Sequence, residues 1–137
     1  MGFIFNDVAI DLLEKYLDAA YQRQEVTANN IANINTPGYK KSYVVFEEFL
    51  AQALKEKEGA PLRCTHPAHL GSVPALDEIA PEIRRDYSTS HRADGNNVSI
   101  EEEMAVLAMN AINYNLAAQQ LSNKLSLLRY VITEGRG

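Results

Sequence analysis

The stretch SIEEEMAVLAMNAINYNLAAQQLSNKLSLLRYVI, residues 99–132, carries the clearest structural signal in the sequence. Its apolar side chains recur at alternating spacings of four and three residues, which is the period of a coiled-coil seam. We therefore expect a long helix over residues 99–133. Ser99, followed three residues later by Glu102, has the form of a capping box at the start of this helix. The expected seam consists of Ile100, Met104, Leu107, Ala111, Tyr114, Ala118, Leu121, Leu125, Leu128 and Ile132.

A second helix is expected over residues 5–33, where the same spacing occurs with a more polar centre. Apolar side chains also lie beside the main seam of both helices, so each helix should have more than one neighbour. We expect the two helices to pair with each other as a coiled coil. The seam of the first helix consists of Ile10, Leu13, Leu17, Ala20, Gln24, Thr27, Ile31 and Ile34.

The length of the C-terminal helix predicts an elongated molecule. A helix of about 33 residues is roughly 50 Å long, whereas a compact chain of this size is about 35–40 Å across. Other copies or other proteins must then cover part of the apolar surface. The expected organisation is an N-terminal coiled-coil helix (1–35), a loop-rich middle segment (36–98) and a C-terminal coiled-coil helix (99–137), in a mainly α fold.

The middle segment has little regular pattern. Thr36 is pushed toward extended geometry by Pro37, and Pro37 and Gly38 fit the two central positions of a type II turn. We expect a small sheet at most. The other expected elements are a strand at 43–46, a short amphipathic helix from 46 to near 59, a strand at 83–88 and a turn at 94–97.

Composition excludes several classes of function. The net charge of -5 argues against nucleic acid or an anionic membrane surface as the main partner. The single cysteine, Cys64, excludes an internal disulfide framework. The longest purely apolar run, from Met104 to Met109, is far too short to span a membrane. Residues 1–7 lack the basic start of a cleaved signal peptide.

Candidates for chemistry are few, and we expect neither an enzyme nor a cofactor. Cys64, His66 and His69 place three potential metal ligands close together, and His91 follows further along the chain. Structural zinc sites usually combine two separated pairs of ligands, and Pro67 restricts the convergence of the two histidine rings. We therefore expect an exposed polar loop here and no metal site.

Asparagines gather at the end of the first expected helix, at positions 29, 30, 33 and 35. Asparagine is a mediocre helix former, so two interpretations stay open. The helix end either frays, with left-handed caps, or the side-chain amides bond to neighbouring backbones in an interface. The second interpretation would extend to Asn110, Asn113, Asn115 and Asn123 on the other helix.

Three stretches of the sequence carry a resemblance to a known family. Residues 28–40, ANNIANINTPGYK, closely resemble the N-terminal signature of the bacterial flagellar rod, hook and related axial proteins. Residues 94–104 look like the stretch that leads such proteins into their C-terminal helix, and residues 123–129 are similar to a proximal rod ending. The short middle segment also favours the proximal rod. The signature residues are Asn29, Asn30, Asn33, Asn35, Thr36, Pro37, Gly38 and Tyr39.

The resemblance implies a non-enzymatic structural subunit of the flagellar rod, with paired helices that stack around the export channel. The implied partners are copies of itself, other rod proteins, a rod-base adaptor, MS-ring or export-gate components and the flagellar type III export apparatus. The implied location is the periplasmic rod of the basal body, reached without a cleaved signal peptide. Export-gate signals of this family have the form Phe-x-x-x-apolar, which Phe46 and Leu50 fit.

Two alternatives belong to other classes of protein. A soluble helical adaptor or export chaperone would use the same hairpin to bind a partner helix, although it has no need of the asparagine-rich signature. A metal-dependent protein built on Cys64, His66 and His69 would require zinc at stoichiometric level.

Overall fold

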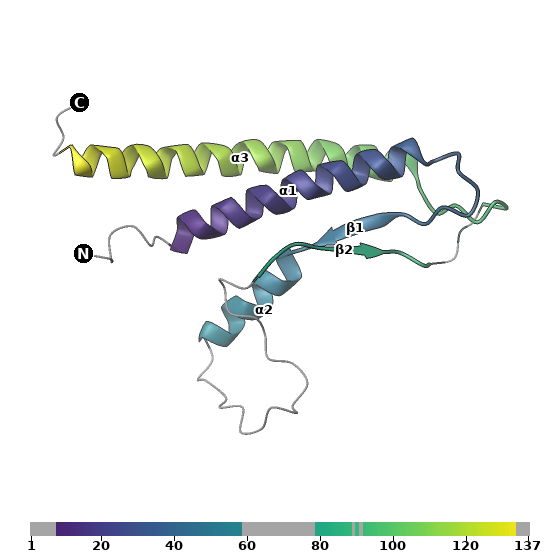
Figure 1. The fold of residues 1–137 in the computed structure, drawn as a ribbon, viewed down its shortest axis with the longest axis horizontal. Helices are drawn as coiled ribbons and strands as arrows, with labels where there is room; N and C mark the ends of the chain where they lie inside the picture. Colours follow the sequence, from purple (N-terminus) through teal and green to yellow (C-terminus); the bar gives the residue numbers. More distant parts are fainter. Residues whose placement is uncertain (1–7, 59–78, 89, 91, 134–137) are drawn as a thin grey trace, which may run out of the picture.

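The computed structural model describes residues 8–58, 79–88, 90 and 92–133. In chain order its elements are α1 (Val8–Ala32), β1 (Ser42–Val45), α2 (Glu47–Glu58), β2 (Glu82–Arg85) and α3 (Ile100–Ile132). The helices α1 and α3 pack against each other along the long axis, and the strands and α2 extend from one side of this pair (Figure 1). The expected mainly α fold, with two long terminal helices and a small strand-containing middle, is confirmed.

The start of α3 is fixed by its cap. Ser99 has extended backbone geometry, and its hydroxyl accepts a hydrogen bond from the N–H of Glu102 at 3.4 Å. The carboxylate of Glu102 accepts a hydrogen bond from Lys41 Nζ at 3.0 Å, which connects the first turn of α3 to the chain before β1. At the other end, Thr133 closes the helix by donating from its backbone N–H to the carbonyl of Arg129.

A small hydrophobic core joins α1 to α2. Phe46 is fully buried and meets the ring of Tyr16 edge-on, with 6.2 Å between the ring centroids. The periodicity of the expected short helix explains this packing, because one face of α2 turns toward α1. The core cluster consists of Ala19, Phe46, Ala53 and Ile79, with Tyr16, Phe49 and Leu50 packed against it.

The strands β1 and β2 pair antiparallel, with Ser42 opposite Arg85. β1 begins one residue before the expected strand. β2 ends at Arg85, three residues short of the expected end at Ser88. The reason is local: the carboxylate of Asp86 accepts a hydrogen bond from the backbone N–H of Ser88 at 2.8 Å, which turns the chain out of the strand.

The expected type II turn is confirmed. The N–H of Tyr39 donates to the carbonyl of Thr36 at 3.2 Å, and Gly38 has a φ of 70°, the left-handed value that this turn requires at its third residue. The second turn lies two residues earlier than expected. The N–H of Gly95 donates to the carbonyl of Arg92, so the turn spans 92–95 instead of 94–97.

Candidate assembly surface and polar junction

The two ends of the middle segment meet in the folded chain. The N–H of Gly38 donates to the carbonyl of Asp94 at 2.8 Å, and the N–H of Asn97 donates to the carbonyl of Tyr39 at 3.4 Å. The backbones approach so closely that a Cβ added at Gly95 would lie 3.8 Å from the Cα of Gly38. We call residues 29–42 and 92–97 together the polar junction.

Asn30 connects α1 to both β1 and α3 within the polar junction. Its amide nitrogen donates to the carbonyl of Ser42 at 2.8 Å and to a carboxylate oxygen of Glu103 at 2.9 Å. Its amide oxygen accepts from the N–H of Ser42 and from the hydroxyl of Tyr39. Two donor hydrogens and two lone pairs are thus all used, which is the full capacity of this side chain. Asn30 is buried and fully bonded and does not fray.

Asn96 binds the segment that follows α1. This side chain is 0% exposed, and its amide nitrogen lies within 3.0 Å of the carbonyl oxygens of Asn33, Ile34 and Thr36. These carbonyls belong to the turns that follow α1, so the amide holds this part of the chain in place from about 60 residues away. Its oxygen accepts from the N–H of Val98 at 2.8 Å.

Further hydrogen bonds complete the polar junction. Asn33 donates to Asn29, and the hydroxyl of Thr36 donates to Asn33. The guanidinium of Arg92 donates to the carbonyl of Ile34 at 3.0 Å. The remaining signature residues Asn35, Pro37 and Gly38 are exposed on the turn itself. Most of the signature therefore bonds within one chain.

Electrostatics in the junction favour an ionised Asp94. The backbone N–H of Asn96 donates to its carboxylate at 3.1 Å, and Arg92 donates to it at 2.9 Å. The hydrogen bond from Asn96 is the main cause that lowers the pKa of Asp94, and Arg92 adds to the effect.

The contact between α1 and α3 is polar at its centre. The buried residues of α3 are Glu103, Asn110 and Ala117, which follow one another at seven-residue intervals. The amide of Asn110, 4% exposed, donates to the backbone carbonyl of Ala20 at 2.8 Å and accepts from Arg23 at 3.5 Å. Asn110 therefore bonds across the helix pair. Asn113 is half-buried, whereas Asn115 and Asn123 are exposed, and Asn123 accepts from Gln119 one turn earlier.

The apolar seam expected on α3 is divided between α1 and solvent. Its partly buried members are Leu107, Ala118, Leu121 and Leu128, and on α1 Ile10, Leu13, Leu17 and Ile31 are likewise half-buried. On either side of the buried line, large apolar side chains remain exposed, and we call these two rows the apolar flanks. The first flank consists of Ile100, Met104, Tyr114, Leu125 and Ile132. The second consists of Val106, Met109, Ile112, Leu116, Leu127, Tyr130 and Val131.

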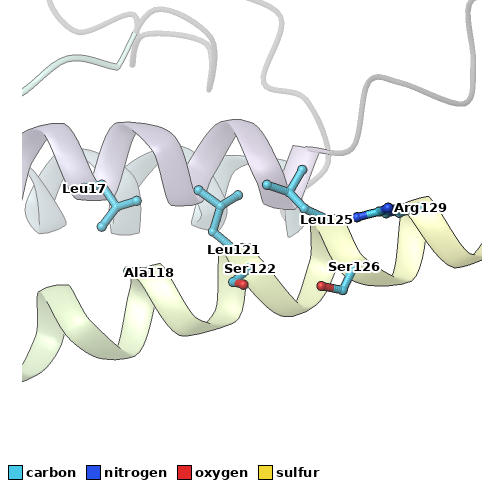
Figure 2. A pocket seen from close by; sticks show the side chains of 7 residues that line it. All are labelled: Leu17, Ala118, Leu121, Ser122, Leu125, Ser126 and Arg129. Carbon is cyan, nitrogen blue, oxygen red and sulfur yellow. The ribbon is translucent and has the colours of Figure 1, made fainter. Parts of the chain in front are cut away.

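A groove of about 390 Å³ lies between the two long helices. Figure 2 shows Leu17 of α1 facing Leu121 and Leu125 of α3 across it. Ser122, Ser126 and Arg129 line the same groove, together with Ala118. Its walls are apolar with a polar rim, an arrangement suited to contact with another protein surface.

The other sequence candidates occupy different environments. Phe46 lies in the core and Leu50 packs against it, so the segment that resembles an export-gate signal is part of the folded interior.

Cys64, His66, His69 and His91 lie outside the described residues. Within the part of the chain that the structure describes, no three His, Cys, Asp or Glu side chains come together as a metal site. None of the helices described here has the length and apolar character needed to cross a bilayer.

The polar junction had weak signals in the sequence. Asn96 and Glu103 fall within residues 94–104, yet their roles depend on partners more than sixty residues away. The local hints were the asparagines at positions 29, 30, 33 and 35 and an asparagine pair after Asp94 and Gly95, and an ordinary turn contains such a pair too.

Comparisons with known proteins identify relatives of this chain. A family model described as "Flagella basal body rod protein" matches residues 17–40, which include the signature half of the polar junction. FlgB of Bacillus subtilis is 34% identical over 127 residues, covering 93% of this chain and 95% of that protein. FlgB of Borrelia hermsii is 35% identical and covers 80% of this chain and 84% of its own. FlgB of Escherichia coli is 29% identical, with coverage of 94% and 96%.

The matches to FlgB thus extend over both long helices, the polar junction and the middle segment, well beyond the residues of the family model. The resemblance noted in the sequence is confirmed, as is the expectation that the protein is structural and not an enzyme. This chain belongs to the FlgB family of flagellar basal body rod proteins.

Proposed function

We propose that the chain is a structural subunit of the proximal rod, which assembles with copies of itself and with other rod proteins around the export channel. Flagellum assembly and motility require it. One observation carries this proposal: the apolar flanks of α3 remain exposed after α3 has packed against α1. Contiguous apolar surface of this kind is typical of a protein that binds other proteins.

The energetics of the flanks suit an assembly surface. One side of a standard interface buries about 800 Å², of which about 60% is apolar, and burying that apolar area would contribute roughly 12 kcal/mol before the entropic costs of association. Two flanks on opposite sides of the buried line allow two neighbours for each subunit. This arrangement is what a stacked helical assembly needs, because every copy must contact copies on more than one side.

The polar junction supports assembly by holding the parts of one subunit together. Asn30 bonds α1 to β1 and α3, and Asn96 bonds the segment after α1 to the loop before α3. Two of these bonds join residues more than sixty apart in sequence, so several contacts between distant segments set the angle between the helix pair and the sheet. A subunit that repeats in a rod requires such a fixed shape.

The proposed location is the periplasmic rod of the basal body, reached by the flagellar type III export apparatus without a cleaved signal peptide. The proposed partners at the rod base are an adaptor and components of the MS ring or export gate. Phe46 and Leu50 are the proposed export-gate signal. Because Phe46 is buried against Tyr16, the export apparatus would read this segment before the chain folds.

A charged residue on an apolar flank tests the proposal. Leu127 is exposed in the single chain, so Leu127→Asp should leave the subunit folded while it disrupts contacts with neighbours. A strain that lacks the gene would be complemented with the parent chain, Leu127→Asp or the apolar control Leu127→Met. We expect the parent and Leu127→Met to restore swimming and completed rods, and Leu127→Asp to restore neither. Full motility with Leu127→Asp would count against the proposal.

A further inference from the structure

The face of α3 that packs against α1 is not its most apolar face. The buried line contains a carboxylate, an amide and a methyl group, from Glu103, Asn110 and Ala117. The N-terminal part of the apolar seam expected from the sequence, with Ile100, Met104 and Ala111, lies to one side of this line and is exposed. Successive helix residues lie about 100° apart around the axis, so Ala111, a member of that seam, lies well away from the position of Asn110. Ala111 is exposed.

Two polar contacts hold the observed face against α1. The Asn110 amide donates to the carbonyl of Ala20, and the Glu103 carboxylate accepts from Asn30, both in buried surroundings. Ala20 is 1% exposed and small, which lets α3 approach closely enough for the first contact. Turning α3 so that the apolar seam faced α1 would bury more apolar area and break both hydrogen bonds. Hydrophobic burial and the polar contacts therefore favour different faces.

We propose that Glu103 and Asn110 select the face of α3 that packs against α1, and so keep the first apolar flank exposed. The role of that flank in contacting neighbouring subunits rests on the proposed function, whereas the selection itself does not. A buried asparagine at one heptad position is known to specify how coiled-coil helices pair, at some cost in stability. Here Asn110 determines which of two faces of α3 packs against α1. The other face then stays available to neighbouring subunits.

The proposal can be tested by thiol labelling of the isolated full chain. In a background with Cys64→Ser, single cysteines are introduced as Ala111→Cys and Ala117→Cys, two matched substitutions on α3. In the parent background we expect the cysteine at 111 to react at least about tenfold faster than the one at 117, because only the second is buried.

Apolar replacement of the selecting residues should reverse this order. We expect Asn110→Leu to reduce the ratio of labelling rates severalfold. With Glu103→Leu added, the cysteine at 117 should become the faster one. Asn115→Leu is the matched control, because Asn115 is an exposed asparagine on the same helix, and it should leave the ratio unchanged. Far-ultraviolet circular dichroism would verify that every variant retains its helix content.

Three results would overturn the proposal. In the first, the ratio of labelling rates at 111 and 117 stays at its parent value when Asn110→Leu and Glu103→Leu are combined. In the second, this ratio is near one already in the parent chain, which would mean that no face is selected. Lost helix content in Asn110→Leu, with both cysteines reacting rapidly, would show that the contacts support folding without selecting a face. None of these results concerns the rod itself, which the motility of Leu127→Asp tests separately.

Discussion

Replacing Asn96 with alanine should strongly destabilise the chain. The side chain is fully buried, and it donates to carbonyl oxygens of the segment that follows α1 while it accepts from the N–H of Val98. The amide has two hydrogens for its three carbonyl contacts, so the variant loses the equivalent of three hydrogen bonds. At about 1 kcal/mol each, the direct loss is about 3 kcal/mol.

The groups left without a partner add to this loss. Val98 is buried, so its N–H would find no easy replacement from water, which costs roughly another 1 kcal/mol. We therefore expect a loss of about 3–5 kcal/mol in the free energy of unfolding, against a typical total of 5–15 kcal/mol. A substantial share of the chain's stability would then depend on one side chain.

Urea unfolding followed by far-ultraviolet circular dichroism measures this loss. Asn35→Ala is the matched control, because Asn35 belongs to the same signature but is exposed on the turn. We expect the control to change the free energy of unfolding by less than about 0.5 kcal/mol. A loss below about 1 kcal/mol for Asn96→Ala would refute the reasoning that this amide holds the segment after α1 in place.

Three further predictions concern single positions. Gly38→Ala should cost about 1 kcal/mol in the free energy of unfolding. The cost comes from its φ of 70° alone, because an added Cβ meets no atom within 4 Å. A Gly38→Asn variant that lost more stability than Gly38→Ala would contradict this. Phe46→Ala should cost about 3–5 kcal/mol in thermal or urea unfolding, and a loss near that of an exposed position would show that the core lies elsewhere. The lowered pKa of Asp94 means that its ionised form stabilises the fold above the unfolded pKa, about 3.9, and that this contribution disappears as the pH falls through the folded value. Asp94→Asn should therefore unfold at a lower temperature than the parent near neutral pH, with the difference narrowing below about pH 4; a difference that stays constant with pH would argue against the carboxylate.

The helices could be predicted from the sequence because their signals are local. The three-and-four spacing and the Ser99 cap predicted α3 to within one residue at each end. The type II turn at Pro37 and Gly38 followed from the backbone preferences of the two residues. Such features depend on neighbours within a turn or two, and a single sequence contains them in full.

The face of α3 and the role of the asparagines could not be predicted in the same way. Apolar periodicity favours the seam from Ile100 to Ile132, but Asn110 faces α1 because a carbonyl ninety residues away accepts its hydrogen bond. Asn30 and Asn96 likewise find their partners only when the ends of the middle segment meet. Buried amides look the same in a sequence as exposed ones, and tertiary partners decide which they are.

Mass spectrometry of purified, detergent-extracted basal bodies from the source organism tests the central claim most directly. Parallel preparations would come from the parent strain and from a strain deleted for this gene. We expect the chain in parent basal bodies, and we expect the deletion strain to lack a completed rod. A chain confined to the cytosol, together with intact rods in the deletion strain, would contradict the account and favour a soluble adaptor.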